Sequence, residues 1–558
     1  MLFYATPTDR AVAGRFKFTL IHLSMAAFAA GILLSLGCGG NGTEEPAPRE
    51  PTVLRLGQPD KPEREQPEPN GAAVTAPGDI DPEAIEVVPR PEDDPRLRRA
   101  VDPALHLDRD ELPDERNAWP LWAEAIDRFD AEVYSERYRE MISTVLEDGV
   151  RALTDSHRRE LARYVADQQP VMDLIAAGIE RGASRPPLPD NGAFTQMPHL
   201  AHLRGIAFVL LADAHLAAGD GRFEHAVDRL TQALGMGGLM VEGAHSMIEG
   251  LVGYSILAAT VEWSPEVALK ADMPQAARRR LLQALVNETD DAAAVAGMWR
   301  GEFWMNAWEL RRLEEGERKG ALSEAVVILG EVLWMEHAED LRRLISMAGA
   351  LREATNGEDV SLVDAGASIG NISELWLVQL RAFDEPWKPD RGDELQDRLE
   401  QMMARTARRG PAIEQLHRQL ERRRTLSGQQ QREAREALMN LVGDTFAQSM
   451  FTAVGMVERT ARQTTASRRA AAVALACVIF EDEHGRMPDT LAELAEQRLL
   501  PAVPTDPFAA EAEQPLYYDA ERRMVWTVGA DQDRADRPDP DRGPREGRPT
   551  AWRIARPQ

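Results

Sequence analysis

Helical periodicity over most of the chain is the feature that most constrains its fold. Between Trp122 and Phe129 the apolar residues recur at i, i+3, i+4 and i+7 spacing, which places them on one face of a helix. Similar patterns, broken at Gly and Pro, predict further helices at residues 132–148, 155–181, 198–219, 222–238, 241–263, 274–315, 320–355, 360–383 and 391–485. Almost no strand pattern occurs between residues 117 and 460. The sequence therefore predicts a mainly α fold, either an irregular helical bundle or a solenoid.

The pattern changes after residue 460 and predicts a small α+β module. Residues 470–480 are apolar nearly all round, so this end of a helix should be buried, and Gly485 should stop the helix. A short helix carrying Leu491 and Leu494 follows, and then a rigid Pro-rich turn at residues 501–508. Two short strands at 516–518 and 524–528 are spaced as a β-hairpin.

The C-terminal order of elements resembles the globular part of the major pseudopilin of type II secretion. Met487 stands where that family has Tyr, and Phe508 where it has Trp. In pseudopilins the module directly follows a methylated N-terminal helix, whereas more than 400 residues intervene here, so the resemblance implies a shared fold. The residues that carry it are Phe480, Gly485-Arg486-Met487-Pro488, Leu491, Leu494, Pro504-Thr505-Asp506-Pro507-Phe508, Tyr517-Tyr518 and Val528-Gly529-Ala530-Asp531.

The same resemblance implies a calcium site, because pseudopilins bind calcium in the matching loop. Here that loop offers Asp531, Asp533 and Asp536, and several oxygen ligands in a flexible loop suit calcium. Arg534 and Arg537 would neutralise the same carboxylates, so a solvated tail of mixed charge is the alternative.

The N-terminus carries the pattern of an export signal. Basic residues, the last of them Lys17, precede an apolar run from Phe18 to Gly37. The end of this run, Leu34-Ser35-Leu36-Gly37-Cys38, resembles the lipobox of bacterial lipoproteins, which implies lipidation at Cys38. The run of about 20 residues is also long enough for an uncleaved membrane anchor. Its start resembles a type IV prepilin, although Lys17 and His22 depart from that family's Gly and Glu.

A Pro-rich acidic segment separates this anchor from the helical region. Fourteen prolines fall between Pro46 and Pro113, and such a composition predicts a disordered linker. The sequence thus divides into an anchor (1–38), a linker (39–115), an α-helical domain (116–460), the pseudopilin-like module (461–531) and a disordered tail (532–558).

The net charge of −27 over 558 residues argues against nucleic acid, because a phosphate-binding surface must be basic. An acidic chain is also repelled by anionic lipid, so membrane contact requires the hydrophobic N-terminus. The second of the two cysteines, Cys477, lies among apolar residues and is expected to be a buried thiol.

One helical hairpin resembles a tetratricopeptide repeat. Ala226 and Ala233 fall where two helices approach closely, and Phe223 and Leu230 where that repeat places large residues. No second copy occurs at a period of 34 residues, and a repeat array needs several units. An ordinary helical hairpin is the alternative.

Candidate chemical sites are few. Glu242, His245 and Glu249 have i, i+3, i+7 spacing, which on one helix would place two carboxylates and an imidazole on one face, as in di-metal bundles. Glu-x-x-His recurs at residues 414–417 and 481–484. The chain has no Gly-x-Ser-x-Gly elbow, phosphate-binding Gly-rich loop or His-Glu-x-x-His motif. Trp304 and Trp308, four residues apart, either line a binding groove or pack in the core.

These features lead to a functional hypothesis. The chain is expected to be a membrane-anchored cell-envelope protein of a non-enzymatic, interaction or scaffold type, with its folded part outside the cytoplasm and another envelope protein as its partner. A structural component of a secretion or pilus-like system is one alternative, and a helical metal-dependent enzyme is another.

Overall fold

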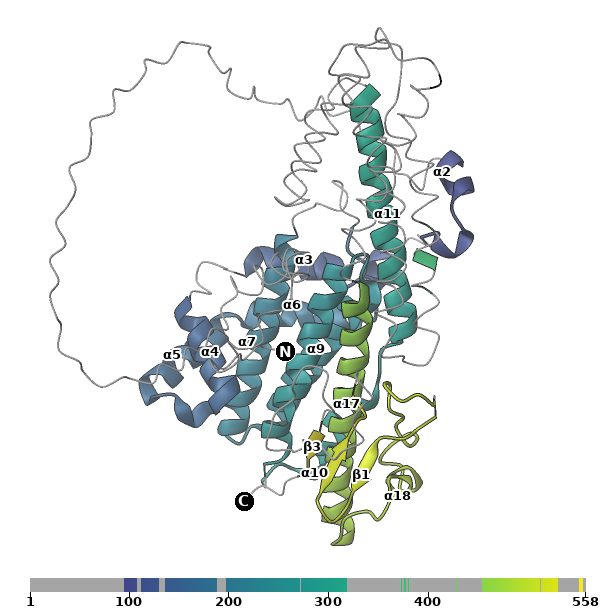
Figure 1. The fold of residues 1–558 in the computed structure, drawn as a ribbon. Helices are drawn as coiled ribbons and strands as arrows, with labels where there is room; N and C mark the ends of the chain where they lie inside the picture. Colours follow the sequence, from purple (N-terminus) through teal and green to yellow (C-terminus); the bar gives the residue numbers. More distant parts are fainter. Residues whose placement is uncertain are drawn as a thin grey trace, which may run out of the picture.

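The computed structural model describes residues 95–107, 112–129, 136–187, 197–270, 272–318, 454–511, 513–529 and 551–554, together with residues 373, 376, 377, 380 and 429. Over these residues the mainly α fold is confirmed, with a small sheet near the C-terminus (Figure 1). Cys38 and the acidic residues Asp531, Asp533 and Asp536 lie outside the described residues, so the predicted lipidation and calcium sites stay predictions.

Short helices form the first part of the helical body. They are α2 (Pro95–Ala100), η3 (Pro103–Leu105), η4 (Asp114–Arg116), α3 (Trp119–Arg128), α4 (Glu136–Asp148), η5 (Val150–Ala152), α5 (Asp155–Asp167) and α6 (Gln169–Glu180). The single helix predicted at 155–181 is wrong, because α5 ends at Asp167 and Pro170 stands in the first turn of α6. Proline has no N–H to donate, so it suits the start of a helix and not its interior.

Close packing joins α3 to α6. The indole of Trp122 is fully buried and donates a hydrogen bond of 3.3 Å to the carbonyl oxygen of Ile175. Gly178 makes the approach possible, since a Cβ built there would lie 2.3 Å from Nε1 of Trp122.

Three long helices form the centre of the body: α7 (Pro198–Gly219), α8 (Phe223–Gly243) and α9 (Met247–Ala268). Helix α8 packs against both α7 and α9. Small residues bring α8 and α9 together, because a Cβ on Gly237 would lie 3.1 Å from the carbonyl oxygen of Gly253. Phe223, Ala226, Leu230 and Ala233, the residues of the repeat-like hairpin, are all buried.

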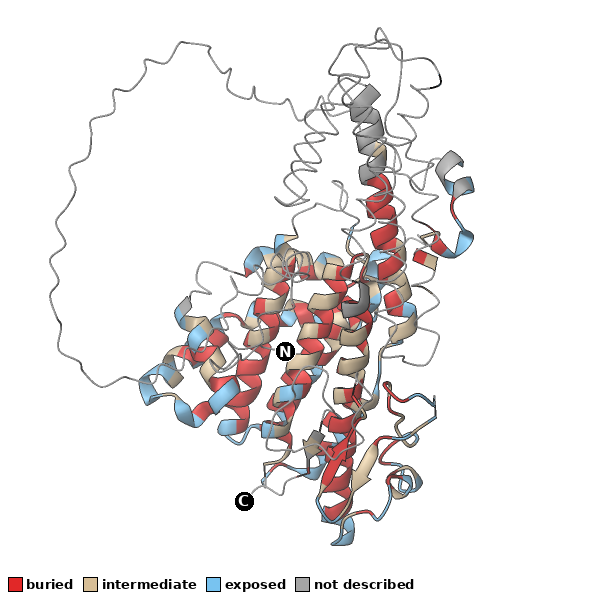
Figure 2. Cartoon of the chain, viewed as in Figure 1, coloured by how far each residue is buried: buried red, intermediate tan, exposed pale blue. Residues whose placement is uncertain are grey.

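Among the described helices, α7 alone is long and apolar enough to cross a membrane. Most of its apolar window is buried inside the folded body (Figure 2).

Three further helices complete the body: α10 (Gln275–Val286), α11 (Asp291–Arg318) and α17 (Val454–His484). The sequence predicts one helix over 274–315, but residues 287–290 interrupt it. Asp290 caps the start of α11, because its carboxylate accepts the N–H of Ala293 at 3.0 Å. A new helix therefore begins here, and the predicted single helix is divided in two. Helix α17 packs along α9, α10 and α11, and all residues from Ala470 to Phe480 are buried, as the apolar run predicts.

The C-terminal module packs on the second half of α17. It contains α18 (Leu491–Glu496) and strands β1 (Tyr517–Asp519), β2 (Met524–Trp526) and β3 (Ala551–Arg553), which pair antiparallel in the order β1-β2-β3. The predicted hairpin is present as β1 and β2. Residues 551–553 differ from the disordered tail predicted over 532–558, because they pair with the free edge of β2 and Ile554 is fully buried.

Candidate functional site

The corner between α8 and α9 holds the residues for which the sequence suggests a metal site. Helix α8 ends at Gly243 and α9 begins at Met247, so the start predicted for the helix at 241–263 is wrong and the break lies at residues 244–246. Glu242, His245 and Glu249 therefore lie on α8, in the connecting loop and on α9, and they do not share one helical face.

A capping box explains the break. The Ser246 hydroxyl accepts the N–H of Glu249 at 3.1 Å, while the Glu249 carboxylate accepts the N–H groups of His245 and Ser246 at 2.8 and 3.1 Å. This reciprocal pattern satisfies backbone donors at a helix start. The signal was in the sequence, since Ser246 is followed three residues later by Glu249.

A second buried carboxylate, for which the sequence carries no local signal, meets the same corner. Glu302 on α11 accepts the N–H of Met247 at 3.1 Å. Burial, and then the nearby charge of Glu249, raises the pKa of Glu302 to about 7. Burial also raises the pKa of Glu249 to about 6, against the opposing effect of its hydrogen bonds. Two carboxylates with raised pKa values therefore accept the backbone N–H groups at the start of α9.

Glu242 faces a different environment. Burial is the largest cause that raises its pKa, and Arg468 of α17 acts in the opposite direction. Over the residues that the structure describes, no group of three or more His, Cys, Asp and Glu side chains is arranged to hold a metal ion.

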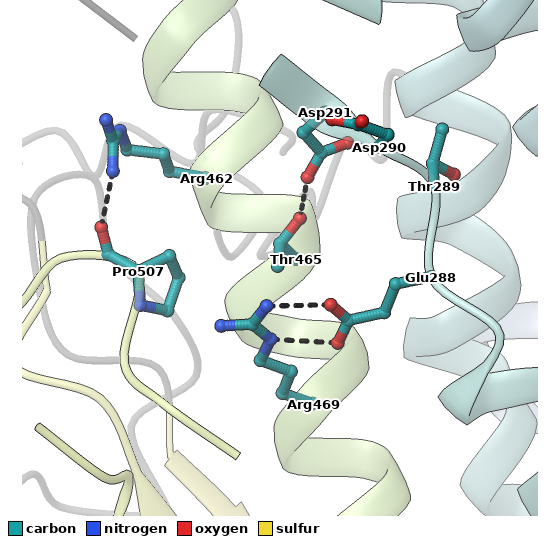
Figure 3. A pocket seen from close by; sticks show the side chains of 8 residues that line it. All are labelled: Glu288, Thr289, Asp290, Asp291, Arg462, Thr465, Arg469 and Pro507. Atoms are coloured by element: carbon teal, nitrogen blue, oxygen red, sulfur yellow. Dashed lines mark hydrogen bonds and ion pairs between the residues drawn. The ribbon is translucent and has the colours of Figure 1, made fainter. Parts of the chain in front are cut away.

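A polar cleft of about 310 Å³ lies where the α10–α11 loop meets α17 and the turn at Pro507 (Figure 3). Its lining residues are Glu288, Thr289, Asp290, Asp291, Arg462, Thr465, Arg469 and Pro507. The guanidinium of Arg469 forms a two-point ion pair with Glu288 at 2.8 and 2.7 Å and also donates to the carbonyl oxygen of Thr505 at 2.8 Å. The cleft thus joins three parts of the chain that are far apart in sequence.

Further buried polar groups lie next to this cleft. The Asp291 carboxylate accepts hydrogen bonds from the hydroxyls of Thr465 and, at 3.0 Å, of Tyr254. Burial raises the pKa of Asp291, and these two bonds oppose the rise. Arg468 donates to the carbonyl oxygens of Ala284 and Leu285 at 2.9 Å each, which satisfies acceptors at the end of α10. The cleft is thus a network of hydrogen bonds and ion pairs that connects α17 to the rest of the helical body.

The Glu-x-x-His pattern at residues 481–484 also has a structural use. Both carboxylate oxygens of Glu481 accept hydrogen bonds from Arg523, at 2.9 and 2.6 Å. This pair connects α17 to the β1–β2 hairpin.

Trp304 and Trp308 lie on α11 and are both buried. Trp304 belongs to an aromatic cluster, and its ring centroid lies 5.4 Å from that of Phe303. In the same cluster Trp376 packs edge-on against Trp299, with ring centroids 5.2 Å apart. The indole N–H of Trp304 donates to the carbonyl oxygen of Leu105 at 2.7 Å.

The partner of Trp304 is thus a segment of the same chain. Val101 and Leu105 are both buried, and Leu105 is fully so. Arg300, one helical turn before Trp304, donates through Nε to the carbonyl oxygen of Ala104 at 2.9 Å. The segment lies within the predicted linker, and nothing in its Pro-rich composition indicated that it would dock on α11.

Comparison with known proteins adds no family to this description. No protein-family model, no curated protein and no solved structure matches the chain.

Proposed function

We propose that this protein is a membrane-anchored cell-envelope protein of the interaction or scaffold type, with its folded part outside the cytoplasm. The export-type N-terminus and the lipobox-like sequence at Cys38 support the anchor. Its partner, under this proposal, is another envelope protein.

The observation that carries the scaffold role is the continuity of α17. This helix of 31 residues packs against α9, α10 and α11 and also against α18 and the strands β2 and β3. Ion pairs reinforce both halves, with Arg469 to Glu288 on one side and Arg523 to Glu481 on the other. One helix shared by two units holds their outer surfaces at a fixed separation, which suits a protein that presents several surfaces at once.

Mass spectrometry of the N-terminal peptide, from native protein extracted from membranes, tests the anchor. A diacylglyceryl group on Cys38 is the expected result. A chain cut elsewhere and recovered in the soluble fraction contradicts the proposal.

Cross-linking in intact cells tests the interaction role. The matched control is Cys38→Ser, which removes the thiol that would be acylated and alters none of the residues that the structure describes. We expect adducts with envelope proteins in the wild-type protein and their loss in the variant, whereas no adduct in either protein argues against a scaffold.

A second candidate is a structural component of a secretion or pilus-like system. The order of elements in the C-terminal module favours it, because α17, α18, the turn at 501–508 and the β1–β2 hairpin follow the order on which the pseudopilin resemblance rests. Under this candidate the N-terminal peptide begins at a methylated Phe18, so the same mass spectrum distinguishes the two.

A further inference from the structure

The start of α9 is held by two carboxylates that come from different helices. Glu249, on α9 itself, accepts the N–H groups of His245 and Ser246. Glu302, on α11, accepts the next N–H group, that of Met247. We call these five residues the carboxylate joint. Its two halves differ, because the half made by Glu249 is local to α9, whereas the half made by Glu302 exists only while α11 stays in place.

The two sides of the joint are tightly packed. A Cβ on Gly301 would lie 2.0 Å from the carbonyl oxygen of His245, and a Cβ on Gly250 would lie 2.1 Å from Sδ of Met298. Helix α11 thus approaches the loop before α9 and the first turn of α9 at two successive places. Glu302 follows Gly301 directly and is only 7% exposed in this contact.

The carboxylates of the joint have no basic partner among the residues that the structure describes. The groups that act on Glu249 and Glu302 are backbone N–H groups, neutral side chains such as Asn306, and the carboxylate of Glu249 itself for Glu302. The loop contributes one further titratable side chain, the imidazole of His245. From α8, Glu242 brings a third carboxylate near the same corner. Burial raises the pKa of both joint carboxyls, to about 6 and about 7.

Two ionised carboxylates in one buried contact repel each other and lose their hydration, and both effects favour separation. One bound proton removes the repulsion and leaves carboxyl oxygens that still accept the N–H groups. Without that proton the two halves respond differently. The capping box of Ser246 and Glu249 can persist within α9, because it does not need α11. The bond between Glu302 and Met247 joins two helices and is the one that breaks.

We propose that the carboxylate joint is a proton-controlled contact between α9 and α11, closed while its two carboxyl groups hold a proton and open when both are ionised. In the open form water reaches Glu302, while the rest of α9 stays helical. The direction follows from linkage. A carboxyl group in water binds its proton more weakly than the same group in the closed joint, so rising pH favours the open form and falling pH closes it.

Hydrogen exchange of the full chain, resolved to single residues by mass spectrometry between pH 5 and pH 8, tests this proposal. The N–H of Met247 exchanges only when the joint opens, and its rate is corrected for the intrinsic pH dependence of exchange. With a pKa of about 7 in the closed form and 4.5 in the open form, the corrected rate should rise on the order of a hundredfold. The double variant Glu249→Gln with Glu302→Gln should lose this rise, because amide oxygens accept N–H groups but bind no proton.

Three controls identify the titrating groups and the extent of opening. His245→Gln should keep the rise, because the imidazole is not one of the two carboxyl groups. The N–H groups of Ile256 and Leu257, in the middle of α9, report global unfolding, and that of Met247 should exchange roughly tenfold faster than these at pH 8. Infrared spectra at pH 6 should show the C=O stretch of a protonated carboxyl group in the wild-type protein and lose that band in the double variant.

Four results overturn the inference. A rise that persists in the double variant means that other groups control the contact, and a rise lost in His245→Gln assigns it to the imidazole. Exchange of Met247 that is no faster than that of Ile256 at pH 8 means that only global unfolding exposes the joint. Absence of the protonated carboxyl band at pH 6 means that the pair holds no proton. None of these results depends on Cys38, so this inference and the proposed function fail separately.

Discussion

Replacing Glu302 with Gln should make the protein more stable at neutral and higher pH. Burial raises the pKa of this carboxyl from 4.5 to about 7, and no cation is among the causes that act on it. Between these values the folded protein holds a proton that the unfolded chain releases. The free energy of unfolding therefore falls as pH rises from 4.5 to about 7 and is level above that.

The size of the effect follows from the two pKa values. A pKa difference of one unit corresponds to about 1.4 kcal/mol. The ionisation of Glu302 therefore lowers the free energy of unfolding by about 3 kcal/mol above pH 7. Gln cannot ionise, and its carbonyl oxygen still accepts the N–H of Met247. Glu302→Gln should therefore be about 3 kcal/mol more stable than the wild-type protein at pH 8 and nearly equal to it at pH 4.5.

Urea unfolding followed by tryptophan fluorescence, at pH values from 4.5 to 8, measures this difference. The matched control is Glu521→Gln on the surface, which should keep the wild-type pH dependence. Part of the slope should remain in Glu302→Gln, because the pKa of Glu249 is also raised, to about 6. A variant that is less stable than the wild-type protein at pH 8, or an unchanged slope, would refute the reasoning.

Three further predictions concern packing, the C-terminal module and a thiol. Gly301→Ala should cost about 3 kcal/mol in urea unfolding, because the new Cβ would lie 2.0 Å from a carbonyl oxygen of the α8–α9 loop. Gly297→Ala, one turn earlier, has 3.9 Å of room and should gain up to about 1 kcal/mol. Arg523→Ala should cost about 2 kcal/mol and speed hydrogen exchange in β1 and β2, whereas the exposed Arg522→Ala should change stability by less than about 0.5 kcal/mol. Burial raises the pKa of Cys477 to about 12, so iodoacetamide at pH 8 should modify this thiol only in urea, as mass spectrometry would show.

Each of these has a clear contrary result. Equal stability of the two glycine variants would mean that α11 does not approach the loop as described. Similar effects of the two arginine variants would mean that the ion pair with Glu481 contributes little. Rapid alkylation of the native protein would place Cys477 at the surface.

The helical class and the buried stretch of α17 were predictable because apolar periodicity is a local property of the sequence. The capping box at Ser246 shows how a local signal is missed. The same Glu249 fits both the capping pattern of a helix start and the spacing of metal ligands, so the sequence alone does not distinguish the two. Pro170 likewise marked a helix start inside a periodic pattern that continued on both sides of it.

The site features that the sequence did not indicate all depend on long-range pairs. Glu302 accepts a hydrogen bond from Met247 at the start of α9, 55 residues away, and Thr465 donates one to the Asp291 carboxylate, 174 residues away. Neither residue has a local pattern that distinguishes it from other buried or surface groups. Trp304 is buried on α11, and its hydrogen-bond partner, Leu105, lies 199 residues away in a segment whose composition predicted disorder.

The place of α17 in the body has a consequence for the order of folding. Its side chains form hydrogen bonds with residues that are far away in the sequence. The sequence separation is 183 residues for Arg468 and Leu285 and 204 residues for Asp482 and Arg278. Contacts of such separation form late, because a long loop must first be closed. During synthesis the faces of α9, α10 and α11 that α17 covers stay exposed until most of the chain has left the ribosome. Under the proposed export, the N-terminal signal emerges long before the core can close, so the chain meets the translocation machinery while it is still incompletely packed.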